Sequence, residues 1–161
     1  MGFRDIIKKI LNLTGNLKPD TGRKDSGDRI SNLPAEAVYR AFHSSPNLMV
    51  ISSISTGIII DVNESFLTTL GYSKKEVTGR TFEELRLFHD IEESNKYIKL
   101  LPRLRKVIDF PVKLKDKKGN THSFFFSAQT LALGEERYLL STFNSDISSV
   151  AMSMNERTED I

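Results

Sequence analysis

The stretch from Asp61 to Leu85 constrains the fold of this chain more than any other, because it predicts three short helices in close succession. Asn63 can cap the first helix by accepting a backbone N–H bond, and Gly71 can end it in the left-handed conformation. Two capping boxes, each a hydroxyl residue followed three positions later by Glu, open the next helices at Ser73–Glu76 and Thr81–Glu84. Few folds require such a series, so the stretch is a signature of fold.

Alternation of apolar and polar residues predicts five strands around this signature. The predicted strands are 47–53, 57–61, 108–115, 121–133 and 137–146. Pro111 lies inside the third strand, and because proline cannot donate a ladder hydrogen bond we expect that strand at a sheet edge. A longer helix is expected from Asp90 to Leu101, just before Pro102.

Several short motifs occur in a fixed order along residues 34–148. They are Phe42–Pro46, Asp61–Phe66, Gly71–Arg80, Lys117–Gly119 and Asp146–Ser148. Their order and spacing closely resemble the PAS domain family, the sensory modules of two-component kinases, cyclases and transcription regulators. The resemblance implies an α+β fold, in which a five-stranded antiparallel sheet carries short helices on one face and follows an N-terminal helical extension.

The composition of the chain argues against several classes of function. The 161 residues carry a net charge of only +2, from 23 basic and 21 acidic side chains, so we expect no nucleic-acid partner. The absence of cysteine excludes disulfides and thiolate metal sites. No apolar run is long enough to span a membrane and no signal-peptide cleavage site is visible, which favours a cytoplasmic location.

Four parts are expected along the chain. Residues 1–13 read as an amphipathic helix and 14–33 as a flexible linker, rich in glycine and charge and poor in apolar residues. The PAS-like domain covers 34–148. Residues 149–161 form a tail or the start of a signalling helix. The N-terminal helix could also make the protein a membrane-surface adaptor, but it is short for that role and membrane association is not expected.

No phosphate loop, dinucleotide-binding motif or nucleophile elbow occurs, so we do not expect an enzyme. PAS domains sense by enclosing a ligand between the inner sheet face and the helices, and alternation allows two registers for the last strands. Similarity to light-oxygen-voltage PAS domains selects one of them. In that register the pocket residues are Phe82, Phe124, Phe126, Ala128, Leu140, Thr142 and Asn144. A packed core without a cavity is the competing interpretation.

The same resemblance suggests two cofactors to consider, flavin and haem. Phe82 stands where light-oxygen-voltage domains have their reactive cysteine, which excludes flavin–thiol photochemistry, while Asn144 falls where they place a flavin-contacting amide. Noncovalent flavin therefore stays open. His89 is a weak candidate for a haem ligand, because it lies just before the Asp90 cap, and the position of the haem ligand in related domains falls about one turn later, near Glu92 or Glu93. A cofactor-dependent redox or gas sensor is thus the alternative to a sensory or protein-interaction domain without cofactor.

The same register places Phe125 and Phe143 on the outer sheet face. Together with Val38 and Phe42 of the helix that begins near residue 34, they are the predicted interaction surface. We expect a homodimer formed through it, or a monomer in which that helix covers the face within one chain. The overall prediction is a PAS input module, as in a sensor histidine kinase or a similar regulator, which detects a small molecule or mediates dimerisation and acts on a signalling output domain or partner protein.

Overall fold

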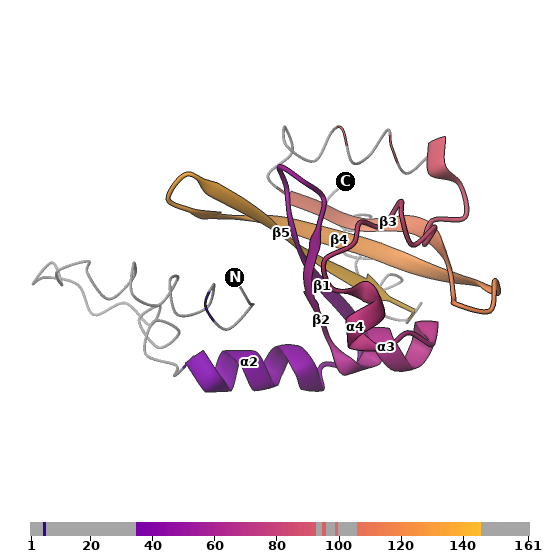
Figure 1. Ribbon diagram of the computed structural model, residues 1–161, viewed down its shortest axis with the longest axis horizontal. Coiled ribbons are helices and arrows are strands. Elements are labelled where there is room, and N and C mark those ends of the chain that lie inside the picture. The colour runs from indigo at the N-terminus through magenta and orange to yellow at the C-terminus, as the bar shows by residue number, and fades with distance from the viewer. Residues whose placement is uncertain (1–4, 6–34, 93–94, 96–98, 100–105, 146–161) are drawn as a thin grey trace, which may run out of the picture.

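The computed structural model describes residues 5, 35–92, 95, 99 and 106–145 (Figure 1). The expected N-terminal helix over 1–13, the linker over 14–33 and the tail over 149–161 lie outside the described residues. Most of the helix expected from Asp90 to Leu101 does so as well.

The described strands form one antiparallel sheet in the order β2-β1-β5-β4-β3. Their bounds are β1 Leu48–Ser53, β2 Ile59–Val62, β3 Lys106–Lys115, β4 Thr121–Leu133 and β5 Glu136–Asn144. All five predicted strands are confirmed, together with the α+β fold class. Strand β3 lies at an edge of the sheet, as Pro111 indicated.

Helices α3 (Glu64–Leu70) and α4 (Lys74–Val77) lie next to the β1–β2 hairpin (Figure 1). The caps predicted for α3 are present: Phe66 N–H donates to Asn63 Oδ1 at 3.1 Å, and Gly71 adopts φ 77° while its N–H donates to Leu67 O at 2.9 Å. The capping box at Ser73–Glu76 opens α4. The box at Thr81–Glu84 also forms, but it closes a hydrogen-bonded turn rather than a third helix.

Asn63 also joins α3 to the chain that leads into β1. Its side chain is fully buried, and besides capping α3 its Oδ1 accepts from Met49 N–H at 3.0 Å. Its Nδ2 donates to Asn47 O at 2.7 Å and to Ser45 O at 3.3 Å. All the hydrogen-bonding capacity expected of a buried amide is therefore used between two segments distant in sequence.

Asp61, which lies in β2 at the start of the signature stretch, is only 4% exposed. Its Oδ2 lies 3.5 Å from His43 Nε2 and its Oδ1 lies 3.1 Å from Lys74 Nζ. Val62 N–H donates to the same Oδ1 at 2.8 Å. One buried carboxylate thus joins α2 (Ala35–Ser44), β2 and α4.

The sheet separates two apolar cores. The inner core, on the side of α3 and α4, contains Leu48, Val50, Ile59, Val62, Phe66, Leu70, Val77, Leu87, Leu114, Phe124, Phe126, Ala128 and Phe143. The outer core contains Phe42, Ile51, Leu133 and Tyr138, with Val38 and Leu140 packed against it. Helix α2 therefore covers part of the outer face within this chain. This agrees with the alternative in which that helix covers the face within one chain.

The register of β5 differs from the prediction. Phe126 pairs with Phe143 and Ala128 pairs with Ser141, and residues directly opposite in an antiparallel pair share a face. Phe143 is therefore an inner-core residue, 1% exposed, and its assignment to the outer interaction surface is wrong. The inward placement of Leu140, Thr142 and Asn144 is wrong for the same reason, because a shift of one residue moves every side chain to the other face.

Candidate functional site

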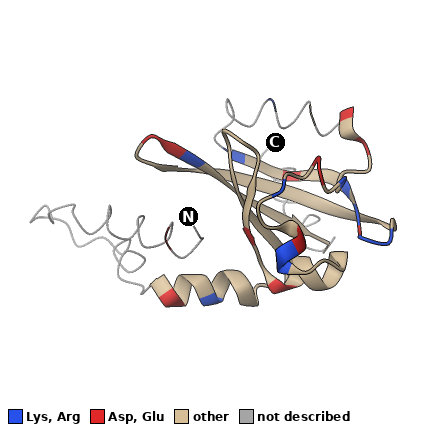
Figure 2. Cartoon of the chain, in the orientation of Figure 1, with Lys and Arg blue, Asp and Glu red and all other residues tan. Residues whose placement is uncertain are grey.

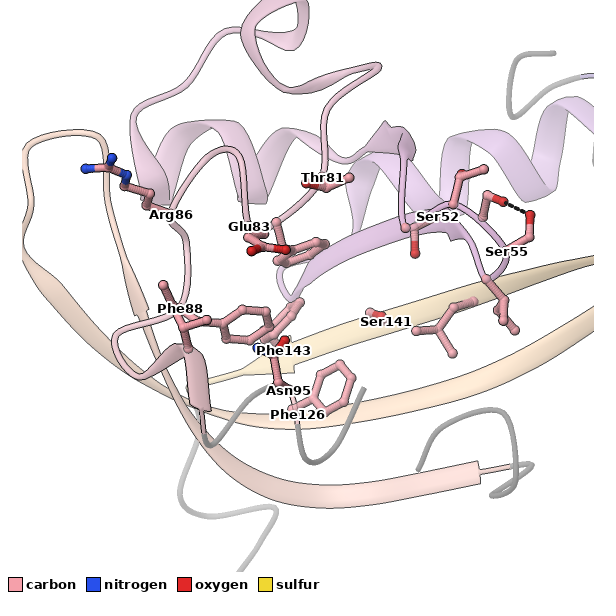
Figure 3. Close-up of a pocket in the computed structure, with 17 residues that line it drawn as sticks. Ser52, Ser55, Thr81, Glu83, Arg86, Phe88, Asn95, Phe126, Ser141 and Phe143 are labelled. Carbon is pink, nitrogen blue, oxygen red and sulfur yellow. Dashed lines mark hydrogen bonds between the residues drawn. The ribbon is translucent and has the colours of Figure 1, made fainter. Parts of the chain in front are cut away.

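A cavity of about 370 Å³ opens on the inner face of the sheet (Figure 3). Its walls come from residues 52–57 at the end of β1 and in the β1–β2 turn, from the segment between Thr81 and Phe88, and from the inner residues of β4 and β5. Ile91 and Asn95 complete the described lining. The volume lies at the lower end of the range of about 300–1,000 Å³ that is typical of small-molecule sites.

One side of the cavity is aromatic. The rings of Phe82 and Phe88 stack with centroids 5.4 Å apart and an angle of 26° between their planes. Phe143 lies 6.2 Å from Phe82 and 5.2 Å from Phe126, measured between centroids. Phe88, Phe126 and Phe143 lie together on one side of the space (Figure 3). With Phe82 they present flat apolar surface to it.

The sheet side carries two serine hydroxyls. Ser52 of β1 is 6% exposed and Ser141 of β5 is 3% exposed, and both line the cavity. Ser52 pairs with Leu139 and Val50 pairs with Ser141, so the two serines are diagonal neighbours on adjacent strands. Neither hydroxyl has a hydrogen-bond partner within the described part of the chain. Neither oxygen is among the fully buried side-chain atoms without a partner in the described part of the chain, so both are open to the cavity as donors and acceptors for a bound group.

The charged residues of the described lining lie at the rim of the cavity. Glu83 and Arg86 are the charged residues among the described lining, and both are exposed. Arg86 has a left-handed backbone at φ 51°, and Figure 3 shows its guanidinium pointing away from the other labelled residues. Elsewhere, Figure 2 shows Lys, Arg, Asp and Glu residues mainly on the helices and at the ends of the hairpins. The interior of the cavity is therefore uncharged among the residues described.

The predicted pocket residues divide into three groups. Phe82 and Phe126 line the cavity, while Phe124 and Ala128 belong to the inner core beside it. Leu140, Thr142 and Asn144 lie on the opposite face. The sequence analysis missed Ser52, Ser141, Leu139, Phe143 and Phe88. Ser141, Leu139 and Phe143 follow from the correct β5 register, and Ser52 follows from the pairing of β1 with β5. Whether any of them contacts a ligand stays a prediction.

The described residues do not fit a haem. His89 is exposed, does not line the cavity, and its Nδ1 lies 3.4 Å from Thr121 Oγ1. The described lining contains no histidine, and no cluster of metal-ligating side chains occurs in the parts of the chain that are described. The amide expected to contact a flavin, that of Asn144, is on the outer face, so the cavity lacks that contact as well.

An ion pair and a histidine–carboxylate hydrogen bond hold the β3–β4 turn. Lys117 Nζ lies 2.6 Å from Glu76 Oε1, and this hydrogen bond lowers the pKa of Glu76 from 4.5 to about 2. Asp116 Oδ2 lies 2.9 Å from His122 Nε2, and its bonds to His122 and to the turn lower its pKa from 3.8 to about 2. Both carboxylates fasten the turn, the first of them to α4, and neither lines the cavity.

Comparison with known proteins finds that the family described as "PAS domain" matches residues 46–149. The sequence matches no curated protein at a significant level. No helix in the described ranges is long and apolar enough to cross a membrane.

Solved structures with a similar fold include three whose alignments cover about seven tenths of this chain. A PAS domain of an HTR-like protein from Haloarcula marismortui is 22% identical, with a TM-score of 0.55, over 68% of this chain and 89% of that chain. A domain of a sensory box sensor histidine kinase/response regulator from Geobacter sulfurreducens is 15% identical, with a TM-score of 0.59, over 69% and 93%. An RNA-binding light-oxygen-voltage receptor is 16% identical, with a TM-score of 0.62, over 74% of this chain but only 35% of that chain.

Proposed function

This chain belongs to the PAS domain family, and we propose that it is a sensory module that binds a small molecule in the cavity on the inner face of its sheet. The observation that carries the proposal is the pair of hydroxyls on the largely buried residues Ser52 and Ser141, which line the cavity without a partner in the described part of the chain. A packed core would leave those groups unsatisfied at a cost in stability, whereas a ligand or ordered water satisfies them. The role is sensory rather than catalytic.

The output of the signal is proposed from similarity. One structure of similar fold is a domain of a sensor histidine kinase/response regulator, which supports a two-component role for this chain. In that role the module would act on a kinase or another signalling domain, in the same chain or in a partner. Its cytoplasmic location stays a prediction from sequence.

Native mass spectrometry of freshly purified protein tests ligand binding. We expect a mass above that of the chain by one small molecule, which denaturation releases for identification. The matched variant is Ser141→Leu, which fills the cavity beside Ala128 and should lose the bound mass while keeping its circular dichroism spectrum. Wild type that carries no extra mass, together with a Ser141→Leu variant of raised stability, would instead support a packed core.

The second proposal is homodimerisation through the outer face. Phe125, half-buried, lies on that face beyond the part covered by α2, next to Asn144 on β5. We expect Phe125→Ser to shift a dimer towards monomer in sedimentation over a concentration series, while Thr68→Ala, at an exposed position of α3, has no effect. Wild type that stays monomeric at high micromolar concentration would end this proposal.

The cofactor alternatives have independent checks. Haem or flavin bound without a covalent bond would give the purified protein visible absorption, and a colourless preparation would contradict both. Liposome co-sedimentation tests the membrane-adaptor role of residues 1–13, which lie outside the described part of the chain.

A further inference from the structure

We propose that the ligand of this cavity is an uncharged amphipathic molecule, with a flat apolar body against the phenylalanine rings and one hydrogen-bonding group on Ser52 and Ser141. The inference rests on the proposed ligand-binding function and names the chemical class that the site accepts. Three properties of the described lining support it.

The first property is the geometry of the aromatic end. Phe82 and Phe88 are stacked on each other, and Phe143 tilts by 33° against Phe82. Flat faces of this kind favour an offset-stacked or edge-on ring in the ligand over a branched polar group. A volume of about 370 Å³ suits a molecule of one or two rings.

The second property is the position of the hydroxyls. Ser52 and Ser141 are diagonal neighbours on β1 and β5, so a single oxygen of the ligand can reach both. Each hydroxyl donates one hydrogen bond and accepts others, so the pair suits an alcohol, a phenol or a carbonyl equally. Because both residues are more than nine-tenths buried, a ligand group that cannot form hydrogen bonds would leave them unsatisfied.

The third property is the absence of charge among the described residues inside the cavity. Neither Glu83 nor Arg86 is buried, and the Arg86 guanidinium points away from the space (Figure 3). An ionised carboxylate or ammonium bound at the serines would lose its hydration without gaining an opposite charge. The site should therefore discriminate against ions of the same shape.

A matched series of probes tests this class: 2-naphthol, naphthalene and 2-naphthoate share one body and differ in a single substituent. Binding is measured by ligand-observed NMR, and the site of binding by the 1H–15N spectrum of the labelled protein. We expect 2-naphthol to bind about tenfold more tightly than naphthalene, the sum of two neutral hydrogen bonds. We expect 2-naphthoate to bind more weakly than 2-naphthol by at least about tenfold.

Variants assign the difference to the serines. The double variant Ser52→Ala, Ser141→Ala should bind 2-naphthol and naphthalene with similar affinity, while the control Ser123→Ala, an exposed serine of β4, keeps the tenfold preference.

The outcomes separate the ligand class from the function. A double variant that keeps the preference, or a wild type that binds 2-naphthoate best, overturns the ligand class and leaves ligand binding intact. Wild type that binds none of the probes also overturns the class, and the native mass measurement then decides the proposed function independently.

Discussion

Replacing Asn63 tests how α3 is held to the sheet. In Asn63→Ala, three backbone groups lose their partner: Phe66 N–H, which is buried, and Met49 N–H and Asn47 O, which are partly buried. Ser45 O keeps a bond, since Ser65 Oγ also donates to it at 2.6 Å. An unsatisfied buried group costs about 1–3 kcal/mol, so we expect the free energy of unfolding to fall by about 3–4 kcal/mol once water has relieved part of the loss.

Asn63→Asp separates two roles of the side chain. Aspartate caps helices as well as asparagine does, so a residue that served only as a cap would tolerate the change within about 0.5 kcal/mol. Aspartate cannot donate, however, and one carboxylate oxygen would face Asn47 O, which lies 2.7 Å from Asn63 Nδ2. We therefore expect Asn63→Asp to lose about 2–3 kcal/mol at neutral pH.

Urea unfolding followed by far-ultraviolet circular dichroism measures both variants, with Thr69→Ala, an exposed position on α3, as a control expected within about 0.5 kcal/mol of wild type. The slope of the transition should stay unchanged, so that the midpoint alone reports stability. An Asn63→Asp protein as stable as the wild type would refute the bridging role.

Three further predictions concern other contacts. Because the pKa of Glu76 is lowered from 4.5 to about 2, its ion pair with Lys117 contributes stability above about pH 4.5 that is lost as the pH falls towards 2; Glu76→Gln should flatten the decline of the urea midpoint over this range, and equal declines would contradict the assignment. Gly71→Ala should cost about 1–2 kcal/mol in urea unfolding, because φ is 77° and the added Cβ meets only an ordinary contact, 3.8 Å from Lys117 Cβ; no loss would contradict the strain. Phe42→Ala should raise amide hydrogen exchange in α2 but not in α3, since Phe42 anchors α2 to the outer core, and uniform change across both helices would argue against a separate outer core.

Local signals predicted much of the fold. The α3 caps, both capping boxes and the edge position of β3 follow from single residues or pairs close in sequence. The second role of Asn63 could not be predicted in this way, because its other partners precede it by 14 to 18 residues. Contacts of that range depend on how β1 and β2 pair, which sequence patterns do not specify.

The β5 error has a different origin. The turn between β4 and β5 contains two residues, Gly134 and Glu135, with Leu133 paired to Glu136. Counting back from that pair brings Phe126 opposite Phe143, so a two-residue hairpin with Gly134 at φ 63° would have predicted the register. Aligning the strand by its far end instead displaced it by one residue. The cavity serines were missed as a consequence, since their chemistry becomes visible only when Ser52 and Ser141 share a face.

Strand β5 limits how a bound molecule could move this protein. Its odd-numbered residues from Leu139 to Phe143 line the cavity, and its even-numbered residues Tyr138 and Leu140 pack in or against the outer core under α2. Sliding β5 by one residue would exchange these two sets and ruin both packings at once. The motion left to the strand is bending or a change of twist, which moves both faces together. A ligand that displaces the cavity side of β5 would therefore also displace the residues on its other face, against which α2 packs.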